Sequence, residues 1–370
     1  MDVSSEMIHS LLPVFLVSAL GASALAVGLV EGVAEATALI VKVFSGTLSD
    51  FIGRRKELAV FGYGLGAVSK PLFALAGTVN AVLGARFIDR VGKGMRGAPR
   101  DALIADMTPP ALRGQAYGLR QSLDTVGAFL GPLLGLVLMA AWGGDFRRVF
   151  WVAVVPGAMA VALLAFGIRE KGSSEGGPAK APVTWRALAR LGPSYWRLVG
   201  LGAVFTLARF SEAFLILRAK DRGLADGLSP LVFIAMNAVY AAAVYPAGLL
   251  ADRVDRRGLM AAGLAALIAA DVVLARAPGL AAVAAGVVLW GLHMGLTQGV
   301  LSAMIADAAP SDLRGSAFGF FNLAAGVAML AASALAGFLW QSFGPAATYW
   351  AGAAFAAASL AILAADAAAA

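Results

Sequence analysis

Twelve apolar runs constrain this chain more than any other feature of its sequence. An α-helix needs about 20 mostly apolar residues to cross the hydrocarbon core of a bilayer. Inside that core every backbone amide must find its hydrogen bond within the protein, which leaves only helices and closed barrels. The apolar and polar alternation of barrel strands is absent, so the runs predict membrane helices. In chain order they cover residues 7–20, 22–45, 58–77, 81–104, 116–141, 149–168, 198–217, 231–250, 259–276, 281–305, 317–340 and 348–365.

The composition agrees with an integral membrane protein and excludes a soluble one. Of the 370 residues, 60% are hydrophobic and 14% are charged, with a mean hydropathy of +0.81. Soluble domains are about half apolar and a quarter charged. The 44 glycines favour helices that pack closely through small residues. The absence of cysteine excludes disulfides and thiolate metal sites.

The net charge of +7 indicates orientation in the membrane rather than binding to nucleic acid. Lysine and arginine cluster in the loops that follow the even-numbered runs, as at Arg54, Arg55 and Lys56, and are rarer in the other loops. Positively charged loops stay on the cytoplasmic side. We therefore expect a multi-pass protein of the cell inner (plasma) membrane, in contact with the lipid bilayer and with both termini in the cytoplasm.

Two stretches of the first half of the chain return in the second half. Residues 46–56 have a degraded copy at 248–258, 202 residues later, and residues 104–118 match 305–319 at an offset of 201. Two matches at nearly one offset indicate a duplicated unit of six helices. Because six is even, both copies enter the membrane from the same side. The predicted organisation is a six-helix half over 1–168, a cytoplasmic linker over 169–197 and a second six-helix half over 198–370.

The first apolar run is short for a membrane helix. A helix that starts at Met1 just reaches about 30 Å. It draws Asp2 and Glu6 into or near the membrane without the usual basic flank. We expect this helix to be truncated, with an upstream segment missing. A second interpretation, compatible with the first, makes Asp2 and Glu6 polar residues of a functional first helix.

The loop between the second and third runs resembles the signature loop of the major facilitator superfamily. The residues that carry the likeness are Gly46, Asp50, Gly53, Arg54, Arg55 and Lys56. Phe51 departs from the family, which usually has a basic residue there; the copy keeps Asp252, Arg253 and Arg256 but has Asp255 at the turn glycine. The resemblance covers the whole chain. It implies an all-α integral membrane protein with the major facilitator fold, twelve transmembrane helices in two pseudo-symmetric six-helix halves.

The fifth run carries a second motif, which resembles the one associated with the antiporter branches of that superfamily. Its residues are Gly127, Gly131, Pro132 and Gly135. The likeness implies exchange of a solute for an ion. A glycine stripe with one proline is also what close packing of ordinary helices requires, and both interpretations stay open.

Charged residues inside the membrane helices of the first half are the most informative functional signal. Each costs at least ~2.5 kcal/mol to insert, so each needs a structural or functional reason. Glu31 and Glu35 share one face of the second helix, and a mainly basic stripe follows the fourth helix through Arg86, Asp89 and Arg90. The two stripes are natural partners. They form either an ion-pair network that holds this half together or a site for substrate and protons.

Two further charges lie one helical turn apart in the fifth helix. Arg120 and Asp124 are spaced so that they either pair with each other or leave Asp124 to carry a proton.

The second half carries fewer charges. Arg209 and Glu212 lie in the middle of the seventh run, three residues apart and far from any loop, which favours a functional role. Asp271 lies close to the end of its helix and is expected to be solvated. Other polar side chains expected to line a cavity are Asn237, His293 and Asn322. His293 could titrate near neutral pH, but a lone histidine in a membrane helix is more often a packing residue that forms hydrogen bonds.

The signature loop suggests a latch between the two halves. Asp50 can accept hydrogen bonds from the amino terminus of the eleventh helix near Gly315, where the helix dipole is positive. Gly53 permits the tight turn, and the basic residues after it can pair with Asp106 or with lipid phosphates. A latch that forms in one state and opens in the other provides the two-state element that alternating access requires.

No phosphate-binding glycine loop, metal-ligand cluster or nucleophile arrangement is present, which excludes an ATP-driven pump and an enzyme. We expect no cofactor and no metal. The remaining class is secondary transport, and our first hypothesis is a monomeric exporter that exchanges protons for a small organic solute or drug. The candidates for proton coupling are Glu31, Glu35, Asp124 and Glu212.

Two other functions remain open at this point. The first is an uptake permease for an anionic metabolite, in which Arg86, Arg90 and Arg209 bind the substrate charge. The second is a receptor or scaffold that transports nothing.

Overall fold

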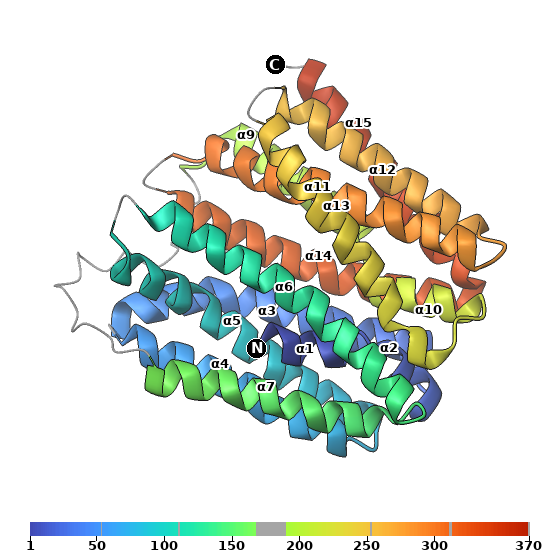
Figure 1. Cartoon of the computed structure of the whole chain (residues 1–370). Coiled ribbons are helices and arrows are strands. Elements are labelled where there is room, and N and C mark those ends of the chain that lie inside the picture. Colours follow the sequence, from blue (N-terminus) through green and yellow to red (C-terminus); the bar gives the residue numbers. More distant parts are fainter. Residues whose placement is uncertain (53, 110–111, 168–189, 252–253, 311–312, 369–370) are drawn as a thin grey trace. The chain divides into compact units, whose positions relative to one another are not determined.

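The computed structural model describes residues 1–52, 54–109, 112–167, 190–251, 254–310 and 313–368, and every regular element in these ranges is helical (Figure 1). Within them, ten helices are long and apolar enough to cross a membrane. The two other predicted spans are the first, which is divided into short pieces, and the fourth, whose charges lower its hydropathy. The predicted all-α membrane architecture is therefore confirmed.

The chain forms two compact units. The first contains residues 1–12 and 33–182. Its helices are α1 (Asp2–His9), most of α3 (Ala24–Ile52), α4 (Arg55–Leu75), α5 (Val79–Met107), α6 (Arg113–Ala141) and α7 (Phe146–Gly167). Helix α4 packs against α5 and α7, and α1 packs against α6 and α7. Glycines allow the closest of these approaches, because a Cβ on Gly92 of α5 would lie 2.6 Å from the carbonyl oxygen of Gly62 in α4.

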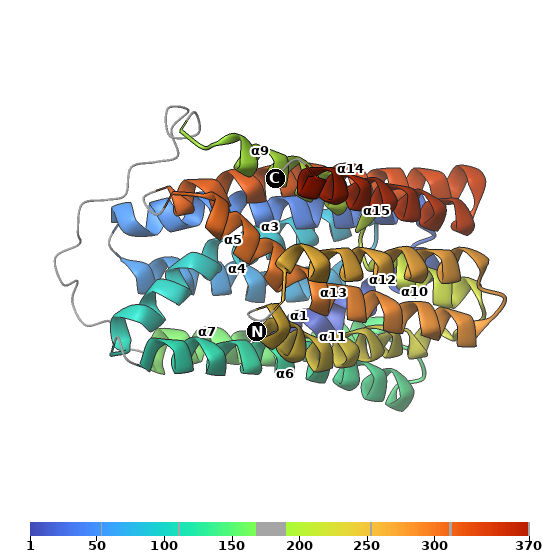
Figure 2. The ribbon, with the colours of Figure 1, turned by 90° about the horizontal axis from the view of Figure 1, so that it is seen from above.

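The second unit contains residues 13–32 and 183–370. Its helices are α2 (Leu12–Val14, shared with the first unit at Leu12), the π-helix η1 (Phe15–Ala19), α9 (Pro193–Ala208), α10 (Ala213–Asp221), the 3-10 turn η3 (Asp226–Leu228), α11 (Pro230–Ala251), α12 (Arg256–Arg276), α13 (Leu280–Ala308), α14 (Arg314–Phe343) and α15 (Pro345–Ala368). Helix α13 lies between α11 and α12 (Figure 2). Helix α15 packs against α9, α12 and α14.

A pair of matching ion pairs shows the predicted duplication in three dimensions. Arg55 at the start of α4 pairs with Asp106 near the end of α5, 51 residues later. Arg256 at the start of α12 pairs with Asp307 near the end of α13, again 51 residues later. The second pair lies 201 residues after the first in sequence. In each unit, the same ion pair therefore joins the start of one helix to the end of the next.

Two expectations about helix ends were wrong. The seventh run, predicted as one helix over 198–217, is interrupted between Ala208 and Ala213 and forms α9 and α10. The first run, predicted over 7–20, starts earlier at Asp2 and passes through α1, α2 and η1. The division into halves at 1–168 and 198–370 stays a prediction, because chain contacts group residues 13–32 with the second unit.

Candidate transport site

The first unit contains a buried ion pair between α4 and α5. Lys70 Nζ lies 2.6 Å from Asp89 Oδ1, and the two side chains are 1% and 4% exposed. Two serines add hydrogen bonds to this ion pair. The Ser69 hydroxyl donates to Asp89 Oδ1 at 3.2 Å, and Lys70 Nζ donates to the Ser5 hydroxyl oxygen at 2.9 Å. A charge without a partner at this depth costs several kcal/mol, so each member keeps the other ionised.

The predicted pairing of acidic and basic stripes is present beside this pair. Arg90 on α5 lies 3.1 Å from Glu35 on α3, and its Nε is 3.9 Å from Asp89 Oδ2. Arg86, one turn before Arg90, is also buried. Lys70, Asp89, Arg90 and Glu35 therefore form a continuous row of alternating charge across three helices. Glu35 is the member at the open end of the row, with 30% of its side chain exposed.

A second cluster joins α1, α5 and α6 of the same unit. Arg120 and Asp124 of α6 pair at 2.7 Å as their spacing suggested, and Arg100 lies 3.7 Å from Asp124. Asp2 of α1 pairs with Arg96 at 3.3 Å and lies within electrostatic range of Asp124. Two acids and three arginines of the three helices are therefore close together in this cluster.

The glycine motif of α6 is a packing surface for α1. A Cβ on Gly131 would lie 2.7 Å from Glu6 Cβ and 2.8 Å from the Val3 carbonyl oxygen. At Gly127 the nearest atom is the Cβ of Asp2, at 3.0 Å, and the contact at Gly135 is looser. Pro132 lies inside the same helix. The motif thus brings the backbone of α1 close to α6 and places Asp2 beside Asp124.

In the second unit the interruption between α9 and α10 carries the charges that the sequence singled out. Arg209 follows the last residue of α9, and Glu212 precedes the first residue of α10. The backbone N–H of Ser211 donates to Ser333 Oγ of α14 at 3.2 Å, outside any helical ladder. Irregular backbone at membrane depth occurs where protein groups satisfy it, and interrupted helices form the binding sites of many transporters.

Polar residues of α11 and α13 lie within electrostatic range of this interruption. Tyr240 on α11 is close to both Arg209 and Glu212, and its hydroxyl is 3.3 Å from Gln298 Oε1. His293 on α13 is completely buried, packs against the ring of Phe205 and lies within electrostatic range of Arg209. Other expected cavity residues, Asn237 on α11 and Asn322 on α14, are half-buried. A role of the two asparagines in a cavity stays a prediction.

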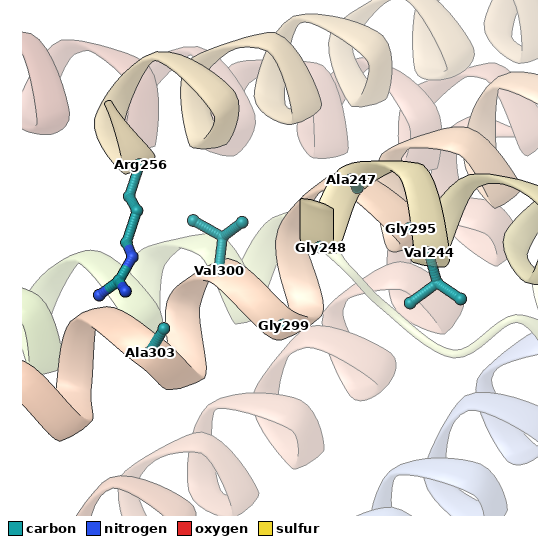
Figure 3. A pocket seen from close by; sticks show the side chains of 8 residues that line it. All are labelled: Val244, Ala247, Gly248, Arg256, Gly295, Gly299, Val300 and Ala303. Atoms are coloured by element: carbon teal, nitrogen blue, oxygen red, sulfur yellow. The ribbon is translucent and has the colours of Figure 1, made fainter. Parts of the chain in front are cut away.

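A cavity of about 200 Å³ opens between α11 and α13 near the start of α12. Its wall is apolar and rich in small residues, and Arg256 is its charged member (Figure 3). Its lining residues are Val244, Ala247, Gly248, Arg256, Gly295, Gly299, Val300 and Ala303. The pocket therefore lies beside the copy of the signature loop and its ion pair with Asp307.

Part of the predicted latch lies outside the described residues. This holds for Gly53 and Asp252 and for the side chain of Asp50, whereas the backbone of Gly46 lies in α3. Of the remaining loop residues, Arg55 forms the expected pair with Asp106, and Arg54 forms an exposed pair with Glu57 at 3.2 Å. The hydrogen bonds proposed for Asp50 stay a prediction.

Lys70 and Asp271 are buried charges that were not identified as site residues from the sequence. Lys70 was overlooked, although a lysine in the middle of the third apolar run is a signal that could have found it. Asp271 was expected to be solvated, and this was wrong: its side chain is completely buried on α12. The contacts that bury it come from α15 and the interruption, which lie far away in sequence.

Comparison with known proteins agrees with this architecture. The chain matches the Major Facilitator Superfamily over residues 1–236 and over 213–367. An uncharacterized MFS-type transporter of Methanocaldococcus jannaschii is 31% identical over 347 residues, which cover 92% of this chain and 85% of the relative.

Two other similarities are shorter or more distant. A multidrug resistance protein of Edwardsiella ictaluri is 28% identical over 155 residues, 42% of this chain and 38% of that protein. The crystal structure of a D-xylose-proton symporter superposes with a TM-score of 0.73 at 18% identity, covering 98% of this chain and 92% of that one.

Proposed function

The chain belongs to the Major Facilitator Superfamily and is a multi-pass membrane transporter rather than an enzyme, and from this premise we propose that it exports a small solute in exchange for protons. The observation that carries the proposal is the row of alternating charges in the first unit. Of its two carboxylates, Asp89 is sealed by Lys70, whereas Glu35 is 30% exposed and has Arg90 as a partner. Water can therefore reach Glu35 but not Asp89.

This difference assigns the two acids different roles. Asp89 is a structural counterion, because protonating it would leave Lys70 charged and buried without a partner. Glu35 can gain a proton while Arg90 keeps Asp89 Oδ2 nearby at 3.9 Å. A cationic solute that binds beside Glu35 would favour its ionised form and displace its proton, which couples solute to proton. Asp124, with 28% of its side chain exposed, is a second carrier in the same unit.

Two observations favour export: the likeness of the glycine motif in α6 to that of antiporters, and the partial similarity to a multidrug resistance protein. The fold itself serves uptake as well, since the D-xylose-proton symporter shares it. Uptake of an anionic metabolite stays the second candidate, and the observation that favours it is Arg209 at the helix interruption, where an anionic group would find a cation.

We place the protein in the cell inner membrane as a monomer. Both termini are placed in the cytoplasm, because the basic loops lie on that side. Alternating access then needs contacts that form in one state and break in the other. The exposed pairs Arg55 with Asp106 and Arg256 with Asp307 are suitable, because surface pairs contribute only about 0–1 kcal/mol and open easily.

The test is proton flux in proteoliposomes against a panel of cationic drugs, neutral solutes and anionic metabolites. We expect cationic or neutral compounds to dissipate an imposed pH gradient with the native protein and not with Glu35→Gln. Arg209→Gln should leave this flux in place. If instead an anion drives proton entry and Arg209→Gln abolishes it, export is refuted and the uptake function holds. If no compound on the panel moves protons, proton coupling itself is refuted.

A further inference from the structure

The second unit contains a buried acid that the proposed function does not use. Asp271 on α12 is 0% exposed, and within the described part of the chain neither of its carboxyl oxygens has a hydrogen-bond partner. A carboxylate in such a place would cost several kcal/mol, far more than a neutral acid. Burial without a partner therefore favours the protonated acid at Asp271 over the carboxylate.

The residues around Asp271 differ from those at the equivalent positions of the first unit. Counting 201 residues on from Lys70 and Asp89 gives Asp271 and Trp290. In the first unit Lys70 and Asp89 form an ion pair at 2.6 Å. In the second unit the cation is replaced by an acid and the anion by a tryptophan, whose Nε1 also has no partner among the described residues. Lys70 is therefore buried with a counterion, whereas Asp271 is buried at the equivalent position without this counterion.

The contacts of Asp271 lead directly to the helix interruption. Asp271 Oδ2 and Phe210 Cε1 converge on Gly352 of α15, at 2.6 and 3.0 Å from the place where a Cβ would lie. Phe210 belongs to the interrupted segment between α9 and α10. Its ring also packs against Trp290 and Tyr349, with centroids 5.4 and 5.6 Å away. The Phe210 ring therefore lies beside Asp271, and a movement of the interrupted segment would displace this ring.

The charged and titratable groups around Asp271 leave the acid without a fixed counterion. Tyr349 on α15 faces it but donates its hydroxyl to the Phe214 carbonyl at 2.8 Å. Arg218 on α10 is fully engaged by the carbonyls of Leu274 and Ala275 and by Asp221. His293 on α13 lies against Trp290, whose ring also contacts Phe210. A proton is the one charge that can neutralise Asp271 here, since no second oxygen ligand for a metal cation faces it among the described residues.

We propose that Asp271 is a further proton carrier, and that the interrupted segment at residues 209–212 controls its access to water through Phe210. The carboxyl takes a proton from water when the segment opens toward one side and returns it to water when the segment opens toward the other. This role rests on the proposed proton-coupled transport. It places a proton site in the second unit, in addition to Glu35 and Asp124 in the first.

Infrared spectroscopy of the reconstituted protein tests the proton on Asp271 directly, since a protonated carboxyl absorbs apart from a carboxylate. At neutral pH we expect Asp271→Asn to remove one component of the protonated carboxyl band. Asp145→Asn is the matched control, because Asp145 is exposed and paired with Arg148 at 3.0 Å and should contribute nothing to that band. An unchanged band in folded Asp271→Asn would overturn the proposal.

Exchange into heavy water separates a proton carrier from a static buried acid. In the native protein the band should shift with deuterium, and in Phe210→Leu, which uncovers the acid, it should shift faster. A band that does not exchange in either protein overturns the carrier role even if Asp271 is protonated. Neither spectrum needs a substrate, so a failure of proton-coupled transport in proteoliposomes is recognised separately from a failure at Asp271.

Discussion

The ion pair between Lys70 and Asp89 gives the sharpest quantitative prediction for stability. Asp89→Asn removes the counterion of Lys70, which is 1% exposed, while Arg90 keeps Glu35 at 3.1 Å. One buried charge is left uncompensated, and removing one partner of such a pair costs about 3–5 kcal/mol. We expect a loss of that size in the free energy of unfolding, measured by denaturant titration of the purified protein with tryptophan fluorescence.

The double variant Lys70→Met with Asp89→Asn decides whether the pair is the cause. Removing both charges should recover most of the loss, because no buried charge is then left alone. Asp145→Asn, which breaks the exposed pair with Arg148, should cost no more than about 1 kcal/mol. If the double variant is as unstable as the sum of both single variants, the two side chains act independently and the reasoning fails.

Three further predictions follow from the packing and the surface pairs. Gly131→Ala should lower the free energy of unfolding by about 1–3 kcal/mol, because the new methyl group meets α1 at 2.7 Å, whereas Gly118→Ala fills open space and should not destabilise. Ser333→Ala should cost about 1–3 kcal/mol in the same titration, because a buried N–H of the helix interruption loses its acceptor. Arg55→Gln and Arg256→Gln should each change stability by less than about 1 kcal/mol and yet alter the rate of solute flux in proteoliposomes; unchanged rates in both would contradict a role for these pairs in gating.

Most of the fold could be predicted because it follows from local sequence. Runs of apolar residues define the helices, and the repeat at an offset of 201 defines the duplication. The ion pair of Arg55 with Asp106 could also be anticipated, since both residues belong to repeated motifs at the ends of adjacent helices. Arg90 and Glu35 could be paired because each lies on a charged stripe that needs a partner in the membrane.

The features that sequence could not reveal depend on residues far apart in the chain. The interruption after Ala208 contains neither glycine nor proline, and the hydrogen bond that supports it comes from Ser333, 122 residues away. Asp271 lies near the end of its helix, which suggested contact with water. Its burial depends on Gly352 and Phe210, and no local pattern brings these two residues to α12.

The most direct test of proton-coupled export is accumulation of a solute in inside-out vesicles under an imposed pH gradient, acidic inside, with no other source of energy. We predict that the native protein concentrates a cationic or neutral compound inside the vesicles, that a protonophore abolishes this accumulation, and that Glu35→Gln shows none. Accumulation that survives the protonophore, or movement that only equalises the concentrations whatever the pH gradient, would contradict the account.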